Sequence, residues 1–463
     1  MAIGSGRTLE DGLAMGRKLM AARAHHKAVQ CHRLLALRFP RDARVYMGLG
    51  QSLRGLGNRE RMTRAFRRAL VLQPEAAAIY YNFGNAEFSF DNAASAITTY
   101  RRALCLDQAR PEIMTGLSLA MLQAGDWTNA WPLYETRESC REFTAQMRDL
   151  HRVVWDGQRI PGQRILLIAE QGAGDAIQFI RYARPLTEAG MTVYVHCQPT
   201  LARLFAAVPW IDNVSTGAQP EFDTTCLIMS LPHRFATGPE TIPDDVPYLN
   251  ALSSPARRPP TDPPRVGLVW AGTPDNTRDE WRSCPQVALT PLLEIPGPNF
   301  QSLQYGWRPG TKPGPWSNVT PLGDKVRDFA DTADVIAGLD LVIAVDTSVA
   351  HLAGAMGKPV WLLLGRHSDW RWLLERDDTP WYPTMRLFRI TEADGAGEFV
   401  KPVRILHQLS RRECREIVHI QVLFGTEVSL AEQVVDFRRR RFSRAGIALR
   451  ASLRAFAEVF GGN

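Results

Sequence analysis

Apolar and small residues recur with a period of 34 along the first 140 residues of the chain. Alignment on Pro40 and Pro74 brings one set of positions into register with a second: Tyr46, Leu49, Gly50, Phe66 and Ala69 with Tyr80, Phe83, Gly84, Tyr100 and Ala103. A third copy follows with Met114, Leu117, Gly125, Ala130 and Tyr134, and a weaker copy comes first with Gly16, Leu19, Ala28 and Leu35. The spacing predicts stacked helix pairs that bury a shared core.

This pattern resembles the tetratricopeptide repeat over roughly residues 8–140. The resemblance implies a superhelix whose concave surface binds a peptide or protein, or which self-associates, and the sequence does not identify the guest. The alternative is that the repeats only cap or dimerise the domain that follows.

After a polar connector at about 141–160, the pattern changes to apolar strands that alternate with helices. Strands are predicted at 164–169, 192–196 and 225–229, and the first is followed by a glycine-rich turn at 170–175 and a helix at 176–183. A proline-rich stretch at 253–264 predicts a stiff linker. A second series begins at 265–272 and continues with strands near 299–303, 341–345 and 360–364.

The predicted fold class is therefore α plus α/β, an α-solenoid followed by two Rossmann-like halves that form a cleft. The predicted domains are residues 8–140, 160–252 and 265–410, with a basic helical tail at 411–463.

The most informative stretch is 342–351, where a buried strand ends in a polar turn that opens a helix. The N–H groups at the start of that helix, together with the hydroxyls of Thr347 and Ser348, would face an anion such as a nucleotide diphosphate. Asp346 and His351 lie within one helical turn of it. The plainer interpretation is that Thr347 or Ser348 only caps the helix and that His351 is a core histidine.

The first α/β unit carries a second polar turn. Gly172 and Gly174 let a ligand approach the backbone closely, and Asp175 lies near the start of the next helix. This turn and the block 346–359 resemble the heptosyltransferase-like, family 9-type glycosyltransferases of GT-B architecture, and in particular bacterial proteins that fuse tetratricopeptide repeats to such a domain. The resemblance spans residues 8 to about 410.

The resemblance implies an inverting transfer that needs no metal and no cofactor beyond the nucleotide-sugar substrate. Asp175 matches the catalytic general base, although it could instead only cap its helix. The residues implied on the donor side are Gly172, Gly174, Gly272, Arg278, Arg282, Gln304, Asp346, Thr347, Ser348 and His351. Arg278 and Arg282 are the cationic candidates for the diphosphate, with a surface role as the alternative for each. Gln304 is the candidate for the nucleotide base.

Two features of the sequence leave the identity of the donor sugar undetermined. The loop 273–280 departs from the heptosyltransferase pattern, so heptose, hexose and amino-sugar donors are all compatible. Trp281, the stretch 369–373 and the pair Trp381 and Tyr382 could stack on a nucleotide or sugar, but packing in a core or domain interface is the favoured interpretation.

Composition narrows the classes of partner. The formal charge of +7 is spread along the chain, so no nucleic acid is expected. Residues 411–463 hold ten arginines against six acidic residues, which makes the tail a candidate for contact with the inner membrane face. The seven cysteines include no C-x-x-C pair, so neither a disulfide framework nor a zinc site is indicated. Without a signal peptide or an apolar span, the expected location is cytoplasmic.

The sequence thus predicts a glycosyltransferase that acts on a protein or glycan acceptor recruited by the repeats. A non-catalytic scaffold with a degenerate GT-B domain and a nucleotide-sugar epimerase remain as alternatives. A dehydrogenase is disfavoured, because Asp175 and Ala176 replace part of the usual glycine pattern.

Overall fold

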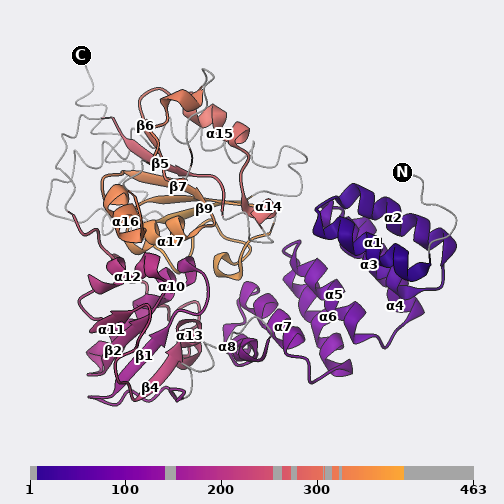
Figure 1. Ribbon diagram of the computed structural model, residues 1–463, viewed down its shortest axis with the longest axis horizontal. Coiled ribbons are helices and arrows are strands. Elements are labelled where there is room, and N and C mark those ends of the chain that lie inside the picture. The colour runs from indigo at the N-terminus through magenta and orange to yellow at the C-terminus, as the bar shows by residue number, and fades with distance from the viewer. Residues whose placement is uncertain are drawn as a thin grey trace, which may run out of the picture. The chain divides into compact units, whose positions relative to one another are not determined.

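The computed structural model describes residues 8–140, 153–253, 263–272, 279–305, 307, 315–322, 326–365 and 367–389. The chain divides into two compact units (Figure 1). Unit 1 comprises Met1–Leu150, Pro232–Pro239 and Arg366–Glu375, and unit 2 comprises His151–Leu231, Glu240–Gly365 and Arg376–Asn463. The predicted sites and segments at Arg278, at 254–262 and at 411–463 lie outside the described residues.

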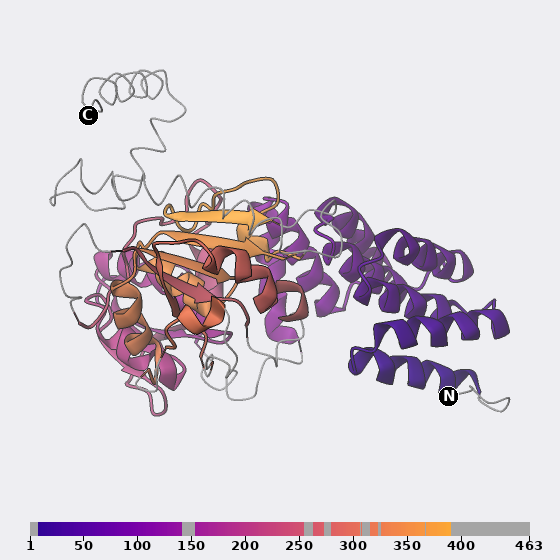
Figure 2. The same ribbon diagram turned by 90° about the horizontal axis from the view of Figure 1, so that it is seen from above.

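The repeats of unit 1 form successive helix pairs, which Figure 2 shows stacked one after another. The helices are α1 (Leu9–Ala21), α2 (His25–Arg38), α3 (Ala43–Gly55), α4 (Arg59–Leu72), α5 (Ala77–Phe88), α6 (Ala93–Leu106), α7 (Pro111–Gln123) and α8 (Trp127–Tyr134), followed by the 3-10 turn η1 (Glu135–Ser139). The first helix of each pair begins at Leu9, Ala43, Ala77 or Pro111, so helix starts recur every 34 residues. The predicted repeat architecture is confirmed.

A glycine on the first helix of a pair faces a ring on the second. A Cβ added to Gly50 would lie 2.7 Å from the Phe66 ring, and one added to Gly84 would lie 2.8 Å from the Tyr100 ring. Phe66 and Tyr100 are fully buried. The small residue at this offset therefore lets the two helices of a pair close around a buried aromatic side chain.

The C-terminal end of the solenoid is completed by segments from much later in the chain. Trp370 packs edge-on against Trp127 and Trp131, with ring centroids 5.9 and 5.5 Å apart. The Asp91 carboxylate accepts the Ser368 N–H at 3.2 Å, and the Trp131 indole N–H donates to the Thr237 carbonyl at 2.7 Å. The last repeats thus depend on residues that follow them by more than a hundred positions.

Unit 2 holds two parallel sheets. The first has the order β3-β2-β1-β4 and the second has the order β6-β5-β7-β8-β9. The strands are β1 (Arg164–Ile168), β2 (Thr192–His196), β3 (Asn213–Ser215), β4 (Thr224–Leu227), β5 (Arg265–Val269), β6 (Asn299–Ser302), β7 (Leu341–Val345), β8 (Val360–Leu364) and β9 (Met385–Arg389). This pair of α/β sheets after a helical solenoid confirms the predicted fold class.

Helices and 3-10 turns connect these strands. Those of the first half are α10 (Ala173–Phe179), η2 (Ile180–Tyr182), α11 (Ala183–Glu188), α12 (Pro199–Ala206), η3 (Ile228–Ser230) and α13 (Leu231–Arg234). Those of the second half are α14 (Asp279–Arg282), α15 (Gln286–Leu293), η4 (Pro315–Asn318), α16 (Phe329–Ala337), α17 (Ser348–Ala355) and η5 (Trp370–Trp372). The last residues of α13 and all of η5 fall in unit 1.

Most predicted strands are present, and several boundaries need correction: the helix predicted to run to residue 183, for example, ends at Phe179 and continues as η2. The strand predicted at 225–229 ends at Leu227, because the chain turns there into η3. The helix predicted to begin at residue 176 begins at Ala173, because Gly172 already serves as its N-cap. The short strands β3 and β9 were not predicted. The predicted domain limits stay predictions, since each compact unit is assembled from separate segments.

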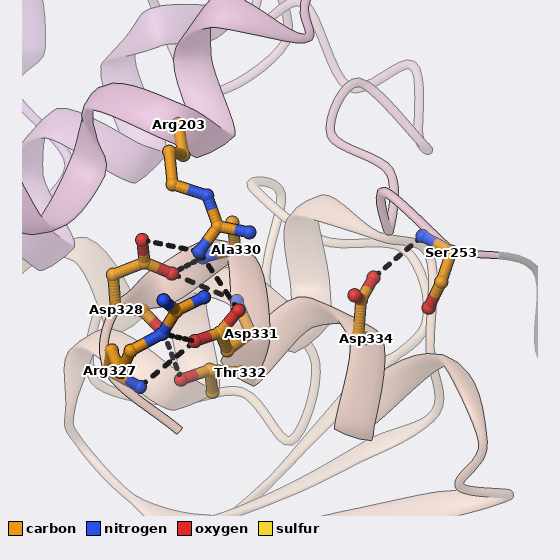
Figure 3. Close-up of polar contacts among 8 residues, drawn as sticks. All are labelled: Arg203, Ser253, Arg327, Asp328, Ala330, Asp331, Thr332 and Asp334. Atoms are coloured by element: carbon orange, nitrogen blue, oxygen red, sulfur yellow. Dashed lines mark hydrogen bonds and ion pairs between the residues drawn. The ribbon is translucent and has the colours of Figure 1, made fainter. Parts of the chain in front are cut away.

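Two helix contacts join the halves of unit 2: α10 packs on α17, and α12 packs on α16 (Figure 1). Figure 3 shows Arg203 of α12 pointing at the start of α16, where it pairs with Asp328 and Asp331, each at 2.9 Å. Nearby, the Ser253 N–H donates to Asp334 at 2.8 Å. Charged contacts therefore hold α12 to the start of α16.

Candidate functional site

In each sheet, the strand order reverses beside the strand that comes first in sequence. The reversal lies between β1 and β4 in one sheet and between β5 and β7 in the other. Parallel sheets bind ligands at the carboxyl ends of their strands, at such switch points. The turn 172–175 follows β1 and the block 346–351 follows β7, so both predicted motifs lie at these points.

The turn after β1 is closed by a local carboxylate. Gly172 is the N-cap of α10, and its N–H donates to the Asp175 Oδ2 atom at 2.9 Å. A carboxylate near a helix N-terminus is favoured by the helix dipole. Asp175 is partly exposed, and one of its two oxygens takes part in this capping bond. The structure thus places Asp175 in the first turn of the helix rather than before it.

The two motifs meet where α10 packs against α17. A Cβ added to Gly174 would lie 3.0 Å from the His351 Cδ2 atom and 3.4 Å from the Ser348 Cα atom. The absence of a side chain at Gly174 thus allows the close approach of a second helix. The prediction that Gly174 makes room for a ligand remains a prediction.

The start of α17 has no side-chain cap from its N-cap residue. Thr347 occupies that position, but its hydroxyl donates to the Val345 carbonyl at 3.2 Å instead of accepting from the helix. Ser348 is the first helical residue. The Ala350 N–H donates to the Thr347 carbonyl at 3.0 Å, and since the Thr347 side chain caps no N–H group, those of Ser348 and Val349 can be directed at an anion.

His351 lies one turn further along and is largely buried. Its side chain is 7% exposed, with Nε2 3.7 Å from the Asp346 Oδ1 atom. Its Nδ1 atom lies 2.9 Å from the Tyr382 hydroxyl. The histidine is therefore a core residue by burial, and it also faces the carboxylate that begins the polar turn.

Three further donor-side candidates, Gly272, Arg282 and Gln304, lie close to the end of β5. The Gly272 N–H donates to Asp279 and to Ser283, each at 3.1 Å, and a Cβ on Gly272 would collide with the Arg282 guanidinium. Arg282 pairs with Asp279 at 3.2 Å. The Gln304 side-chain oxygen accepts the Ala271 N–H at 3.0 Å.

These contacts join Gly272, after β5, to Asp279 of α14 and to Ser283, and Arg282 pairs with the Asp279 carboxylate. Because β5 and β7 are parallel neighbours in register, Val269 opposite Ala344, their carboxyl ends lie at the same edge of the sheet. The candidates Gly272, Arg282 and Gln304 therefore belong to the same edge as the block 346–351.

Sequence reasoning missed the buried residues behind the site. Arg181 donates to the Trp381 carbonyl at 2.8 Å and to the Tyr248 hydroxyl at 2.9 Å. Burial raises the pKa of Tyr248 and the nearby Arg181 charge opposes that rise only in part, so the hydroxyl keeps its proton. No sequence pattern connects these positions, because their contacts arise only from tertiary packing.

Three tryptophans and one tyrosine that were candidates for stacking on a ligand are core residues. Trp370, Trp372, Trp381 and Tyr382 are all at most 2% exposed. Their rings therefore pack inside the protein, as the favoured interpretation predicted. Nothing is described of the Trp281 side chain.

Residues 326–400 match the model of glycosyltransferase family 9 (heptosyltransferase), and this range contains the block 346–359. The chain joins tetratricopeptide-type repeats to a glycosyltransferase family 9-like unit. This fusion was the resemblance predicted from the two sequence blocks and the 34-residue period, and it is confirmed.

One curated relative matches much of the fusion. Protein FlbA of Caulobacter vibrioides is 28% identical over 331 residues, which is 60% of this chain and 52% of FlbA. The chain thus spans about half the length of that relative.

Two solved structures are similar at lower identity. A mutant O-GlcNAc transferase of Thermobaculum terrenum is 14% identical, covers 99% of this chain and 98% of its own, and has a TM-score of 0.32. A thermophilic tetratricopeptide protein of Thermus thermophilus is 20% identical, covers 31% of this chain and 79% of its own, and has a TM-score of 0.28. Because both scores are low, the fold of the fusion rests on its helix pairs and sheet orders.

Within the described ranges, no group of three or more His, Cys, Asp or Glu residues is arranged to hold a metal ion. In the same part of the chain, no helix combines the length and the apolar character that a membrane crossing requires.

Proposed function

We propose that the protein is an inverting, metal-independent glycosyltransferase. It transfers a sugar from a nucleotide-sugar donor to a protein or glycan acceptor that the repeats recruit. The observation that carries this proposal is the meeting of two turns: Gly174, after β1, lies against Ser348 and His351, after β7. Both turns follow strands at topological switch points, where α/β proteins bind nucleotides.

The second half supplies the donor site. As the bond to the sugar breaks, negative charge grows on the leaving nucleoside diphosphate, and fixed donors must stabilise it. The N–H groups at the start of α17, the hydroxyls of Thr347 and Ser348, and His351 are the groups proposed for this role. Arg282 contributes from the end of α14, and Arg278 is the second cationic candidate.

The first half supplies the general base. The acceptor hydroxyl must lose a proton as it attacks the anomeric carbon, and a carboxylate at the site can take it. Asp175 is the proposed base. Its capping bond engages Oδ2, and a carboxylate can accept further hydrogen bonds.

The donor site is tested by nucleotide binding. UDP, GDP, ADP, CMP and TDP are titrated by calorimetry into the full chain, with Asp346→Ala and His351→Ala as variants. We expect one nucleotide to bind the wild type and to bind both variants at least tenfold more weakly. Thermal unfolding of each variant confirms that it is folded. No binding of any of the five to the folded wild type would contradict the proposal.

The role of Asp175 is tested by comparing Asp175→Asn with Asp175→Ala. Asparagine keeps an oxygen that can accept the Gly172 N–H, but it cannot act as a base. We expect Asp175→Asn to slow the release of nucleoside diphosphate from the nucleotide-sugar about 100-fold or more while thermal stability and nucleotide binding stay near wild type. Asp175→Ala should also lower stability by about 1 kcal/mol.

If Asp175 only caps its helix, the turnover of the two variants should differ from this expectation. Asp175→Asn would then turn over like the wild type, and only Asp175→Ala would be impaired, through stability. The independence from metal is tested in the same assay, where EDTA should leave the rate unchanged.

One alternative has specific support. Asp175 is engaged in a cap and Arg282 is paired with Asp279, which is the arrangement expected of a non-catalytic scaffold that keeps the fold for assembly. A folded wild type that binds none of the five nucleotides would favour this scaffold function.

A further inference from the structure

The second helices of the first three repeats, α2, α4 and α6, turn one side away from the rest of the solenoid. Each packs against the first helix of its own pair and against the first helix of the next pair (Figure 2). The buried side of α4, for example, consists of Met62, Ala65, Phe66 and Ala69. The opposite side of each helix therefore faces outward and is exposed.

Basic residues recur on that exposed side at the repeat spacing of 34. Arg33, Arg67 and Arg101 hold the same position in α2, α4 and α6, and Lys27 and Arg61 share a second position in α2 and α4. All five residues are exposed. Because successive helix pairs stack in the same way, positions that are equal in the sequence form rows across the helices.

A third row shows that positions equal in the sequence are also equivalent in space. The Arg68 Cζ atom lies 5.8 Å from the centroid of the Tyr46 ring, and the Arg102 Cζ atom lies 6.0 Å from the centroid of the Tyr80 ring. Each of these arginines thus contacts a tyrosine on the first helix of its own pair. The two repeats present their arginines in the same geometry.

The positive charge of the three helices is balanced by a single exposed acidic residue on them. Of the exposed residues of α2, α4 and α6, nine are lysine or arginine and only Glu60 is acidic. Glu60 pairs with Arg64 at 3.1 Å. Arg33, Arg67 and Arg101 form no ion pair with the residues that the structure describes. We call the exposed residues of these three helices the basic face, and its charge is complementary to an anionic partner.

Large apolar side chains lie on the same face. Leu37 is 82% exposed and Val71 is 71% exposed, and they hold equal positions in α2 and α4. Leu37 follows Arg33 by four residues, as Val71 follows Arg67, so each lies one helical turn from an arginine of the first row. A partner with an anionic layer above an apolar layer would cover both kinds of side chain at once.

We propose that the basic face is a docking surface for a membrane of anionic phospholipid. The guanidinium groups bind the headgroup phosphates, and Leu37 and Val71 enter the boundary between headgroups and acyl chains. Arginine suits this position, because its apolar stem can lie along that boundary while its charge stays at the level of the headgroups. Lipids also move laterally, so each cation in a row can find a headgroup. The surface is built by the repeats alone, and the inference does not rest on the proposed function.

The test is sedimentation of the full chain with two kinds of vesicle, phosphatidylcholine alone and an equal mixture of phosphatidylcholine and phosphatidylglycerol. We expect the wild type to bind the mixed vesicles and not phosphatidylcholine alone. The triple variant Arg33→Gln, Arg67→Gln and Arg101→Gln should bind the mixed vesicles at least about tenfold more weakly, because each cation near the surface adds to the attraction. Glutamine retains helix propensity, and thermal unfolding verifies that the variant is folded.

The matched control replaces three exposed arginines of unit 2, Arg159, Arg184 and Arg327, with glutamine. Both triple variants have the same net charge, so a difference between them reports where the charges lie. We expect the control to bind the mixed vesicles near the wild-type level. Equal weakening of the two triple variants would overturn the proposal, since binding would then follow net charge alone. Binding that neither variant weakens would also overturn it, because the contact would lie elsewhere in the chain.

The apolar part of the contact is tested with Leu37→Gln. Its control is Val287→Gln in α15, because Val287 is 76% exposed and lies in unit 2. Salt screens charges but does not weaken the burial of an apolar side chain. The severalfold weaker binding expected of Leu37→Gln should therefore persist as salt rises, while the effect of the first arginine triple variant should shrink.

Two further outcomes would overturn the assignment to lipid. A wild type that binds neither kind of vesicle excludes the docking surface outright. A weakened arginine triple variant beside an unaltered Leu37→Gln variant would show that charge alone is recognised, and a soluble polyanion such as an acidic protein segment would then be the partner.

Discussion

Gly174 leaves little room for a side chain, because a Cβ there would lie 3.0 Å from the His351 Cδ2 atom and 3.4 Å from the Ser348 Cα atom. His351 cannot easily give way, since Tyr382 holds it. We expect Gly174→Val to cost about 2 kcal/mol through overpacking and to abolish nucleotide binding. Thermal unfolding and calorimetry measure the two effects.

The matched control at the residue scale is Gly338→Ala. Gly338 also lies at a helix end, but its added Cβ would meet only the Val335 carbonyl, at an ordinary 3.5 Å. This variant should unfold and bind nucleotide like the wild type. Equal tolerance of valine at Gly174 would show that α10 and α17 do not depend on close approach there.

At the scale of elements, the contact between α12 and α16 is ionic. Hydrogen bonds from Arg327 and then Arg203 lower the pKa of Asp331 to about 2. A carboxyl whose pKa falls on folding stabilises the protein above its ordinary value of 3.8, and this contribution is lost as pH falls towards 2. We expect Arg203→Ala to reduce the loss of stability over this acid range, as measured by thermal unfolding.

The salt dependence of the melting temperature is a second test of the contact between α12 and α16. Arg203 is 46% exposed, so the effect of Arg203→Ala on melting temperature should be modest at low salt and should shrink at high salt. Arg184→Ala is the control, because Arg184 is similarly exposed, at 48%, and pairs with Glu188 inside one helix. Only the Arg203 variant should increase hydrogen exchange in both α12 and α16. Identical exchange in the two variants would argue against a contact that joins the halves.

At the scale of the whole molecule, unit 1 is assembled from separate segments. Trp370 is 2% exposed between Trp127 and Trp131, so Trp370→Ala should cost about 3–5 kcal/mol. Hydrogen exchange followed by mass spectrometry should show protection lost in α7 and α8. Trp361→Ala, in the core of unit 2, should leave exchange of those two helices unchanged. Unaltered protection of α7 and α8 in Trp370→Ala would mean that the solenoid end is complete without this segment.

The spacing of residues along the chain was sufficient to predict much of the fold. Helix starts every 34 residues, and strands such as β1, β2, β7 and β8, follow from local periodicity, because period alone decides which side of an element can be buried. The turns at 172–175 and 346–351 were predictable for the same reason. Each is a short polar motif that directly follows an apolar strand.

The sequence by itself therefore determined the repeats, most of the strands and the positions of the two polar turns. Only the tertiary structure decided that Gly174 lies against His351, that Arg282 pairs with Asp279, and that Trp370 belongs with the repeats. It alone also brought Arg181 and Tyr382 behind His351. The physical reason is that such contacts depend on strand order and helix packing between segments far apart in the chain, which local spacing does not encode.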